Sequence, residues 1–341
     1  MKGAHYTADE VLSYNAKITS IMSIRSLGKS YDMMKRLLNV SLSGKNVAWS
    51  RWDADQTKTS LAEFKAFAES TKNITFSSET VAKGITWLTP KDVDDVGSIL
   101  FVPVKDAAKA KGIDRVFKWW VYDEFIPEFY QNRIQKETEY EKWQSLYTTL
   151  RRNNSDFRAV LMGNRISWFN DYFTHWGVRP FPSGEIRRFK RSVFGYESDI
   201  VVEHVKPSPE ALERIIKFEV EKGRTEEEIL DYLENATQDK DFFIGKCPDL
   251  NIPLEWIQLY SRGSYYGWRE YDGHIYFTPI KPRSDRPIMA LNRRELSDGM
   301  IRDRGIGQKI EDWINRGIVR FDSGKTLNAI FDLVSLSRER L

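Results

Sequence analysis

One stretch near the N-terminus, ITSIMSIRSLGKSY at positions 18–31, restricts the fold of this chain more than any other. It begins as an alternating, β-branched run typical of a strand and continues in a pattern typical of a helix. Between the two lie Gly28, Lys29 and Ser30, which close the phosphate-binding pattern G-x-x-x-x-G-K-[ST]. We therefore expect a strand, a phosphate-binding loop and a helix, the opening unit of an α/β fold.

Each residue type in this loop has a chemical reason. Gly28 lets backbone N–H groups turn toward phosphate oxygens, and the following helix points its positive end at the same anion. Lys29 is expected to reach the β- and γ-phosphates of a nucleotide, and the Ser30 hydroxyl to bind Mg²⁺. Ser23 replaces the first glycine of the pattern, so the chain enters the loop without the residue that turns most easily. The structural alternative is a helix N-terminus that happens to contain Lys and Ser.

A second stretch, VFKWWVYDEF at 116–125, reads as an apolar strand that ends in two acids. Desolvating two carboxylates is costly, so a buried strand that ends in adjacent acids indicates a use for them. We expect Asp123 to hold Mg²⁺ and Glu124 to orient and polarise an attacking water. The alternative is the start of a helix, where acids are common in the first turn.

Further polar residues follow these two motifs. A charged helix expected over 132–152 ends in Arg151 and Arg152, and Arg158 lies beyond a turn. Arginines at a helix C-terminus suit the helix dipole, but one of them could instead be supplied to the γ-phosphate of a neighbouring subunit. Asn164 closes the next strand, where a polar side chain would lie beside the phosphate loop and could sense the γ-phosphate.

Composition narrows the function classes. Among 341 residues, 52 Lys and Arg face 49 Asp and Glu, and a net charge of +3 excludes a purely electrostatic DNA coat but allows a local basic stripe. Lys105, Lys109 and Lys111 in an expected loop, with Lys58, form either a solvated face or a DNA-backbone contact. Cys247 has no partner for a disulfide, and no stretch approaches the ~20 apolar residues of a membrane span, so we expect a protein of a reducing, intracellular compartment.

Two domains are expected, because the composition shifts at KPSP, positions 206–209. An α/β domain over 1–205 is followed by a helical linker over 206–241 and a small α+β domain over 242–341. In the small domain Asp272-Gly273 marks a hairpin. No compact set of acids there could hold two metals ~3.5–4 Å apart, so cleavage activity is not expected. The acids of this region lie in an expected turn or loop: Asp272, Asp285, Asp298 and Asp303.

Three other features bear on the site. Tyr6 and Tyr14, before the first strand, are placed either to stack on an adenine base or to pack under the sheet edge. Arg51 ends the second expected strand, at the carboxyl edge where open α/β sheets bind ligands. The basic run 187–191 precedes a last expected strand at 200–204.

In this order and spacing, the motifs resemble those of the encapsidation ATPases, the genome-packaging motor proteins of small short-tailed phages with protein-primed linear DNA. These are related to the ATPase of large terminases. The likeness covers most of the chain and depends on the segments VLSYN, SIRSLGKS, VYDEF, TTLRRNN, DFFIG and GWREYDGHIYF. None of the segments is diagnostic singly; their order is.

The resemblance implies a fold and a set of site residues. The fold is a P-loop NTPase domain of the additional-strand, catalytic-glutamate type, followed by a small α+β domain like ribonuclease H that has lost its nuclease activity. Arg151 best matches the arginine that acts across subunits, with Arg152 and Arg158 as alternatives. The remaining roles are the nucleotide loop of Arg25, Ser26, Leu27, Gly28, Lys29 and Ser30, a γ-phosphate contact at Asn164, magnesium at Ser30 and Asp123, and catalysis by Glu124 and Lys29.

The resemblance also implies partners. ATP and Mg²⁺ would drive a five-membered ring that pushes double-stranded DNA into a preformed capsid, in the host cytoplasm at the portal vertex. An RNA bridge between ring and portal is left open. Two alternatives remain from the sequence: another DNA-translocating or helicase-like ATPase, and a catalytically inactive nucleic-acid-binding assembly protein, which the substitution at Ser23 favours.

Overall fold

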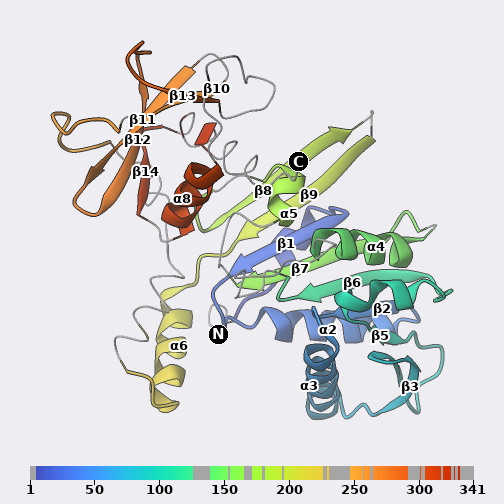
Figure 1. The fold of residues 1–341 in the computed structure, drawn as a ribbon. Helices are drawn as coiled ribbons and strands as arrows, with labels where there is room; N and C mark the ends of the chain where they lie inside the picture. The colour runs from blue at the N-terminus through green and yellow to red at the C-terminus, as the bar shows by residue number, and fades with distance from the viewer. Residues whose placement is uncertain are drawn as a thin grey trace. The chain divides into compact units, whose positions relative to one another are not determined.

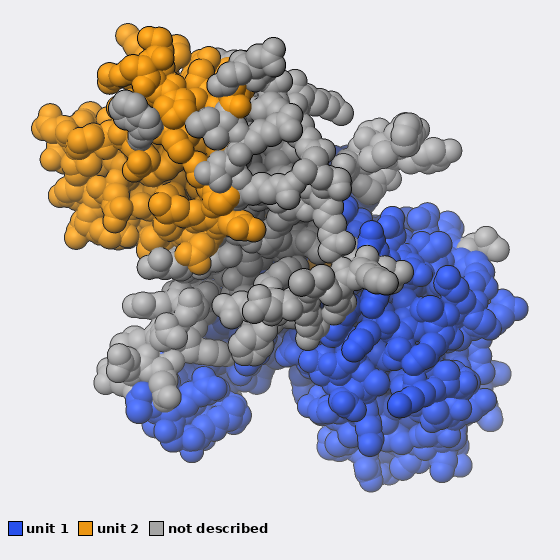
Figure 2. Space-filling view, viewed as in Figure 1, with its two compact units in different colours: residues 1–166, 175–177, 184–236 blue, residues 167–174, 178–183, 237–341 orange. Residues whose placement is uncertain are grey.

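The chain divides into two compact units, which Figure 2 shows in different colours. The first comprises residues 1–166, 175–177 and 184–236, and the second comprises 167–174, 178–183 and 237–341. Each is described by itself. The computed structural model describes residues 5–125, 139–152, 154–164, 171–178, 181–193, 196–225, 229, 246–255, 257–261, 264–290, 300, 304–315, 318–323, 326 and 329–330.

The first unit is built around one nine-stranded sheet (Figure 1). Along the chain its strands are β1 (Ile18–Ser23), β2 (Asn46–Ser50), β3 (Phe76–Ala82), β4 (Ile85–Pro90), β5 (Ile99–Phe101), β6 (Phe117–Asp123), β7 (Arg158–Asn164), β8 (Glu185–Val193) and β9 (Tyr196–His204). Their order across the sheet is β3-β4-β5-β2-β6-β7-β1-β9-β8. The strands from β5 to β9 in this order are parallel, whereas β3, β4 and β8 are antiparallel additions at the two edges. The strand β7 therefore separates β1 from β6.

The helices in this part of the chain are α1 (Asp9–Ser13), α2 (Lys29–Leu42), α3 (Ala54–Lys72), α4 (Glu139–Arg151), α5 (Asp171–Trp176) and α6 (Pro209–Glu221), with the 3₁₀ helix η1 (Val104–Ala110). Residues of α1, α2 and α3 share an apolar cluster with the sheet, α6 packs instead against the loop after β1, and α5 is divided between the two units. One face buries Val121 and Val160 with Phe64 of α3 in a single apolar cluster. On the other face Trp120 stacks on Trp143 of α4, with ring centroids 5.9 Å apart. Alternate residues of β6 thus serve the two cores, as expected for a strand buried on both faces.

Short polar signals set the helix ends. The Asp53 carboxylate accepts the backbone N–H of Gln56 at 2.9 Å and starts α3. Asn73, with a φ of +53°, ends it in the left-handed conformation. Ser208 caps α6 in the same way, with Pro209 in the first helical turn, where its missing N–H has no cost.

The second unit contains a five-stranded sheet and a helix. Its strands are β10 (Gln258–Ser261), β11 (Ser264–Tyr271), β12 (His274–Ile280), β13 (Ile288–Ala290) and β14 (Val319–Phe321), in the order β13-β10-β11-β12-β14. Trp268 packs on Phe277 of β12 and on Trp313 of α8 (Arg304–Asn315). The predicted hairpin turn is confirmed, since Asp272 and Gly273 join β11 to β12 with φ values of +47° and +72°.

The structure corrects the predicted element pattern at four places. The basic run 187–191 lies in the edge strand β8, and α5 was not predicted. Lys105 and Lys109 lie in η1 where a loop was predicted, because two short turns follow the buried Val104. The strand β13 lies in a region predicted as loop. The start of the helix predicted over 132–152, most of the predicted linker beyond residue 225, and Asp298 and Asp303 lie outside the described residues.

Among the described helices, none is both long and apolar enough to cross a membrane.

Candidate active site

The loop between β1 and α2 has the backbone that a phosphate-binding turn needs. Gly28 is the N-cap of α2 and has a φ of +98°, which a residue with a Cβ rarely adopts. Ser26 is also left-handed, with a φ of +64°. Ser23 remains in the strand, paired with Asn164 of β7, and is not among the residues with positive φ. The glycine missing from the pattern is therefore not needed at this position.

Two segments hold the carbonyl groups of the loop from outside. The backbone N–H of Tyr6 donates to the Leu27 carbonyl at 3.0 Å, and the Arg214 guanidinium on α6 donates to the Ser26 carbonyl at 3.0 Å. Within the part of the chain that the structure describes, no side chain caps the N-terminus of α2. The first N–H groups of α2 are thus available to an anion, as in other helix-terminal phosphate sites.

Tyr6 is a packing residue, so the hypothesis that it stacks on adenine is wrong. Its hydroxyl donates a short hydrogen bond to the Glu203 carboxylate on β9, and its ring packs against the apolar cluster under the sheet. Burial raises the pKa of Glu203 to about 7. Tyr14 is partly exposed, with the Arg188 guanidinium 5.9 Å from its ring centroid.

Lys29 is 7% exposed and its ammonium lies under the loop. Its Nζ donates to the Ser23 hydroxyl, to the Ile24 carbonyl at 3.1 Å and to Asn164 Oδ1 at 3.4 Å. Burial lowers the pKa of Lys29 to about 8, against the opposing effect of Asp123 and Glu124. The three oxygens hold the ammonium where a phosphate would meet it, and they place Asn164 beside it.

The two acids lie at the end of β6, as predicted: Asp123 is its last residue and Glu124 follows it. Asp123 is 3% exposed, and its Oδ2 accepts the Ser30 hydroxyl at 3.1 Å. Burial raises the pKa of Asp123, and Arg51 opposes this effect. Glu124 has a φ of +55°, a strained conformation for a residue with a side chain. Phe125 fixes the turn by donating its N–H to the Met162 carbonyl at 3.1 Å.

Arg51 contacts both acids. Its Nη2 lies 2.9 Å from Asp123 Oδ2, and its Nη1 pairs closely with Glu124 Oε2. The Arg51 side chain is 17% exposed and that of Asp123 only 4%, so this pair is shielded from water, whereas the Glu124 side chain is 40% exposed. Sequence reasoning placed Arg51 at this edge of the sheet but gave it no partner, because the pairing depends on β2 and β6 being neighbours.

The phosphate loop, both acids and Asn164 line one open cleft, of about 880 Å³, a volume within the usual range for ligand sites. Glu63 of α3 and residues of α6 also line it, and Figure 1 shows α3 and α6 on opposite sides of the start of α2. The lining of this phosphate-loop cleft includes every predicted nucleotide-loop residue: Arg25, Ser26, Leu27, Gly28, Lys29, Ser30 and Asn164.

The donor set fits magnesium. The Ser30 hydroxyl and the Asp123 carboxylate, 3.1 Å apart, are hard oxygen ligands, and Mg²⁺ commonly takes one or two such groups with phosphates and waters. Within the described residues there is no group of three or more His, Cys, Asp or Glu placed to hold a metal ion by themselves.

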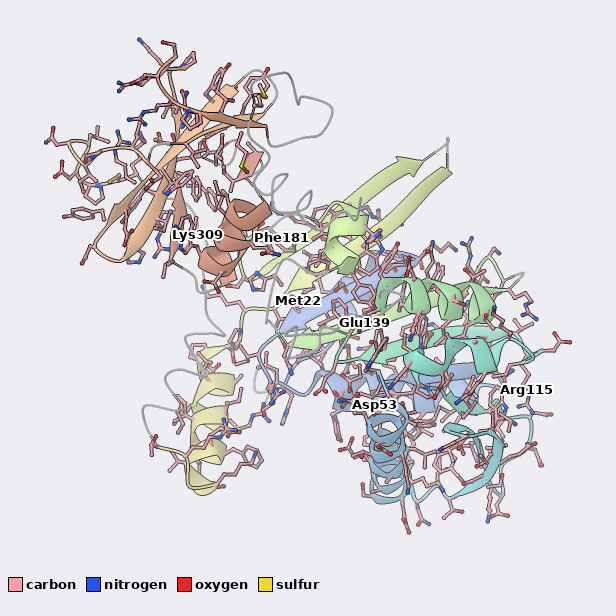
Figure 3. All side chains as sticks on the ribbon, in the orientation of Figure 1. Met22, Asp53, Arg115, Glu139, Phe181 and Lys309 are labelled. Carbon is pink, nitrogen blue, oxygen red and sulfur yellow. The ribbon has the colours of Figure 1, made fainter. Side chains whose placement is uncertain are left out.

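The predicted arginines lie at the amino ends of the strands, the edge of the sheet opposite to the phosphate-loop cleft. The α4 helix begins at the carboxyl edge, where Tyr122 donates its hydroxyl to Glu139 at 2.6 Å. It ends at Arg151, and Arg158 is paired with Trp119 near the start of β6. Figure 3 labels Met22 and Glu139 toward one side and Arg115, just before β6, toward the other. At ~3.3 Å per strand residue, the length of β6 separates the two edges by roughly 20 Å.

These arginines lie in or beside a second concave surface, of about 1080 Å³. We call it the arginine groove and define it by Lys111, Tyr147, Arg151, Arg152 and Asn154. Arg152 donates to the Lys111 carbonyl at 3.0 Å, and the Arg151 guanidinium lies 6.0 Å from the Tyr147 ring centroid. The phosphate-loop cleft and the arginine groove share no lining residue.

The four predicted DNA-contacting lysines lie on α3, on η1 and directly after η1. Lys58 on α3 is exposed, and Lys105 is the second residue of η1, with its N–H bonded to the Trp52 carbonyl near the carboxyl edge. Lys109 pairs with Asp106 at 2.9 Å. Lys111 lies in the arginine groove.

Comparison with known proteins now adds the family. The family model "Podovirus DNA encapsidation protein (Gp16)" matches residues 1–214. The chain belongs to this family. Its function is the packaging of viral DNA, and the resemblance deduced from the motifs is confirmed.

Solved structures are similar to this chain in fold. The chain is similar to the structure described as "The Phi-28 gp11 DNA packaging Motor", with 15% identity, a TM-score of 0.50, and coverage of 98% of this chain and 99% of that one. It is also similar to "The bacteriophage Phi-29 viral genome packaging motor assembly", with 18% identity, a TM-score of 0.50, and coverage of 98% and 100%. At these identities the likeness shows the fold alone, a mixed α/β fold with a large parallel sheet. A search of curated protein sequences finds no match.

Proposed function

We propose that this chain is the ATP-hydrolysing subunit of a ring-shaped motor that moves double-stranded DNA into a preformed capsid. One observation is the main support: Lys29, Ser30, Asp123 and Glu124, from two separate motifs, meet in one cleft at the carboxyl edge of the sheet. Family membership supplies the DNA substrate. The geometry supplies the reason to assign ATP hydrolysis.

Each site residue has a proposed role. The N–H groups of the loop and of α2 bind the phosphates, Lys29 neutralises the β- and γ-phosphates, and Asn164 reports the γ-phosphate. Ser30 and Asp123 would hold Mg²⁺, which supplies charge neutralisation on the transferred phosphoryl group. Glu124 orients the attacking water. The turn at Glu124 places its carboxylate at the mouth of the cleft, 40% exposed, whereas Asp123 is buried.

Arg51 sets a condition on catalysis. In the present conformation its guanidinium holds the Glu124 carboxylate, so the carboxylate must exchange Arg51 for a water before it can act. Asp123 keeps its own contacts with Arg51 and Ser30 through this exchange.

The positions of the arginines support hydrolysis between neighbouring subunits. Arg151, with Arg152 and Arg158 as alternatives, lies roughly 20 Å of strand length from the acids of its own chain, too far to reach the same phosphate. A neighbour's arginine would complete the charge on the transition state. A closed ring of heterologous contacts brings one subunit's amino edge to the next subunit's cleft, and we propose a pentamer.

The remaining assignments follow from the family. We propose that the chain acts in the host cytoplasm at the portal vertex, either directly or through an RNA. Residues 242–341 are proposed as a ribonuclease H-like domain without nuclease activity, 206–241 as a linker and 1–205 as the ATPase domain. Lys58 and Lys105 are the better candidates for sequence-independent contacts with the DNA backbone, because Lys109 is paired and Lys111 lies in the arginine groove.

The test is ATP hydrolysis by the full chain, with and without duplex DNA. We expect Glu124→Gln to lower the rate by about 10³-fold with ATP binding retained, and Lys29→Ala to lower both. Glu63→Gln is the matched control, because Glu63 lines the same cleft without a proposed role. A Glu124→Gln variant that hydrolyses ATP as fast as the wild type would reject the enzyme assignment.

A further inference from the structure

The α6 wall of the phosphate-loop cleft has no role in the mechanism above. This helix is anchored to the loop at two levels. Arg214 donates to the Ser26 carbonyl at 3.0 Å, and Ile215 packs in one apolar cluster with Ile24 and Leu27. The wall is therefore a fixed part of the cleft.

The next turns of α6 present an aromatic side chain to the cleft. Phe218 follows Ile215 by three positions and precedes Lys222 by four, so the three residues share one face. All three line the cleft. Phe218 is 46% exposed, which is unusual for a large apolar side chain.

Neighbouring charges position the Phe218 ring. Lys222 Nζ lies 4.0 Å from the ring centroid, a cation–π contact. The same ammonium pairs with Glu219 at 3.3 Å, and Glu219 also pairs with Arg224 at 3.0 Å. The ring is held in place while nearly half of its surface stays open to the cleft.

The direction of a bound triphosphate selects this wall for the base. Its γ-phosphate end lies toward Asp123 and Glu124, the acids that line the cleft. Glu63 of α3 lines the cleft as well, and α6 lies on the other side of the start of α2 from α3 (Figure 1), so the base extends toward α6. Tyr31, an exposed aromatic of the same cleft, packs edge-on against Phe67 of α3, with centroids 5.0 Å apart. Tyr31 thus lies on the side of the acids.

We propose that the Phe218 face of α6 is the base-binding subsite, where the ring stacks on the base of a nucleoside triphosphate. The inference rests on the proposed function of the cleft. Stacking is available to every base, and the described residues that line the α6 wall include no amide side chain, so the subsite binds ATP and GTP with similar affinity.

The experiment compares the affinities of the full chain for ATP and for inorganic triphosphate, which has no base. Phe218→Ala is expected to weaken ATP binding about tenfold and to leave triphosphate binding unchanged. Phe218→Trp should retain the wild-type affinity for ATP. Ile216→Ala is the matched control, since Ile216 is an exposed apolar residue of the same helix outside the cleft lining, and it should change neither affinity.

Three outcomes would overturn the subsite. They are equal ATP affinity in Phe218→Ala and wild type, an equal loss for ATP and triphosphate, and a tenfold loss of ATP affinity that appears in Tyr31→Leu instead. Failure of the proposed function has a different signature, namely wild-type protein whose ATP binding does not depend on Lys29.

Discussion

The carboxyl edge and the amino edge of the large sheet, where its parallel strands end and begin, differ in the burial and pairing of their charged side chains. At the carboxyl edge, Lys29, Arg51 and Asp123 are buried or nearly so, and each contacts its neighbours through hydrogen bonds or ion pairs. At the amino edge, Arg151 and Arg152 are exposed and line an open groove.

This difference is informative about how the chain is used. A buried ion-pair network is costly unless every charge is compensated, so its geometry is set within one chain. Exposed arginines have little effect on the stability of their own fold, and their charge is available to another molecule. We therefore propose that the carboxyl edge is a nearly complete catalytic site and that the amino edge carries the part that a second subunit would receive.

The largest expected effect concerns the amino edge. Arg151→Ala should lower DNA-stimulated ATP hydrolysis by about 10³-fold or more, because the transition-state charge loses its external partner. Arg152→Ala is the matched comparison: its guanidinium is engaged with the Lys111 carbonyl, and we expect a loss of less than about tenfold. Steady-state kinetics on the assembled protein would measure both. The reverse ranking would assign the trans-acting role to Arg152.

Next in size is the effect of opening the network at the carboxyl edge. Arg51→Met should lower the free energy of unfolding by about 1–3 kcal/mol at neutral pH, because Asp123 keeps a buried charge without its main partner. Lys118→Met, which breaks the more exposed pair with Asp156, should cost no more than about 0.5 kcal/mol. Urea unfolding measures both free energies of unfolding. Equal losses in the two variants would mean that the buried pair of Arg51 and Asp123 stabilises the fold no more than an exposed surface pair does.

A smaller effect should follow from the lowered pKa of Lys29, about 8. As pH rises from 8 to 9 the protonated fraction of free protein falls, so ATP affinity should fall by up to about tenfold in wild type. Lys29→Ala should bind weakly with no such slope. A flat affinity profile for wild type would show that the ammonium does not meet the phosphates.

The same lowered pKa affects the stability of the free protein. Between pH 8 and the ordinary lysine value of 10.5, the unfolded chain binds more protons than the folded chain, so this group makes the free protein more stable as pH rises.

The smallest effect is expected at Ser23. Its hydroxyl accepts from Lys29 and donates to the Ile24 carbonyl at 2.8 Å, and it needs no glycine-like backbone. Ser23→Gly should therefore change ATP affinity by no more than about threefold, while lowering stability by about 1 kcal/mol through the lost buried hydrogen bonds. Titration calorimetry and urea unfolding measure the two quantities. A gain of tenfold or more in affinity would show that Ser23 impairs the loop.

The sequence allowed much of the carboxyl edge to be predicted, because its signals are local. The turn at Gly28, the acids after β6 and the polar end of β7 each follow directly from a strand and a short motif. Their meeting in one cleft follows from the rule that parallel strands expose ligand sites at their carboxyl ends. The separation of Arg151 from that cleft follows from the return of α4 across the sheet.

Other features depend on tertiary contacts that periodicity does not reveal. The edge strand β8 is rich in arginine and was read only as a basic run, since an edge strand with solvated faces lacks the apolar alternation of a buried one. The pairing of Arg51 with both acids depends on strand order. The contact of Arg214 with Ser26 joins residues that are 188 positions apart.

The central claim is that the two edges are halves of one site contributed by different subunits. Arg151→Ala protein retains its acids, and Glu124→Gln protein retains its arginine, so each alone should be nearly inactive. Mixed in equal amounts with DNA, the two should recover a substantial fraction of wild-type hydrolysis, because some interfaces combine an intact cleft with an intact arginine. A mixture no more active than the sum of its separate components would contradict the account.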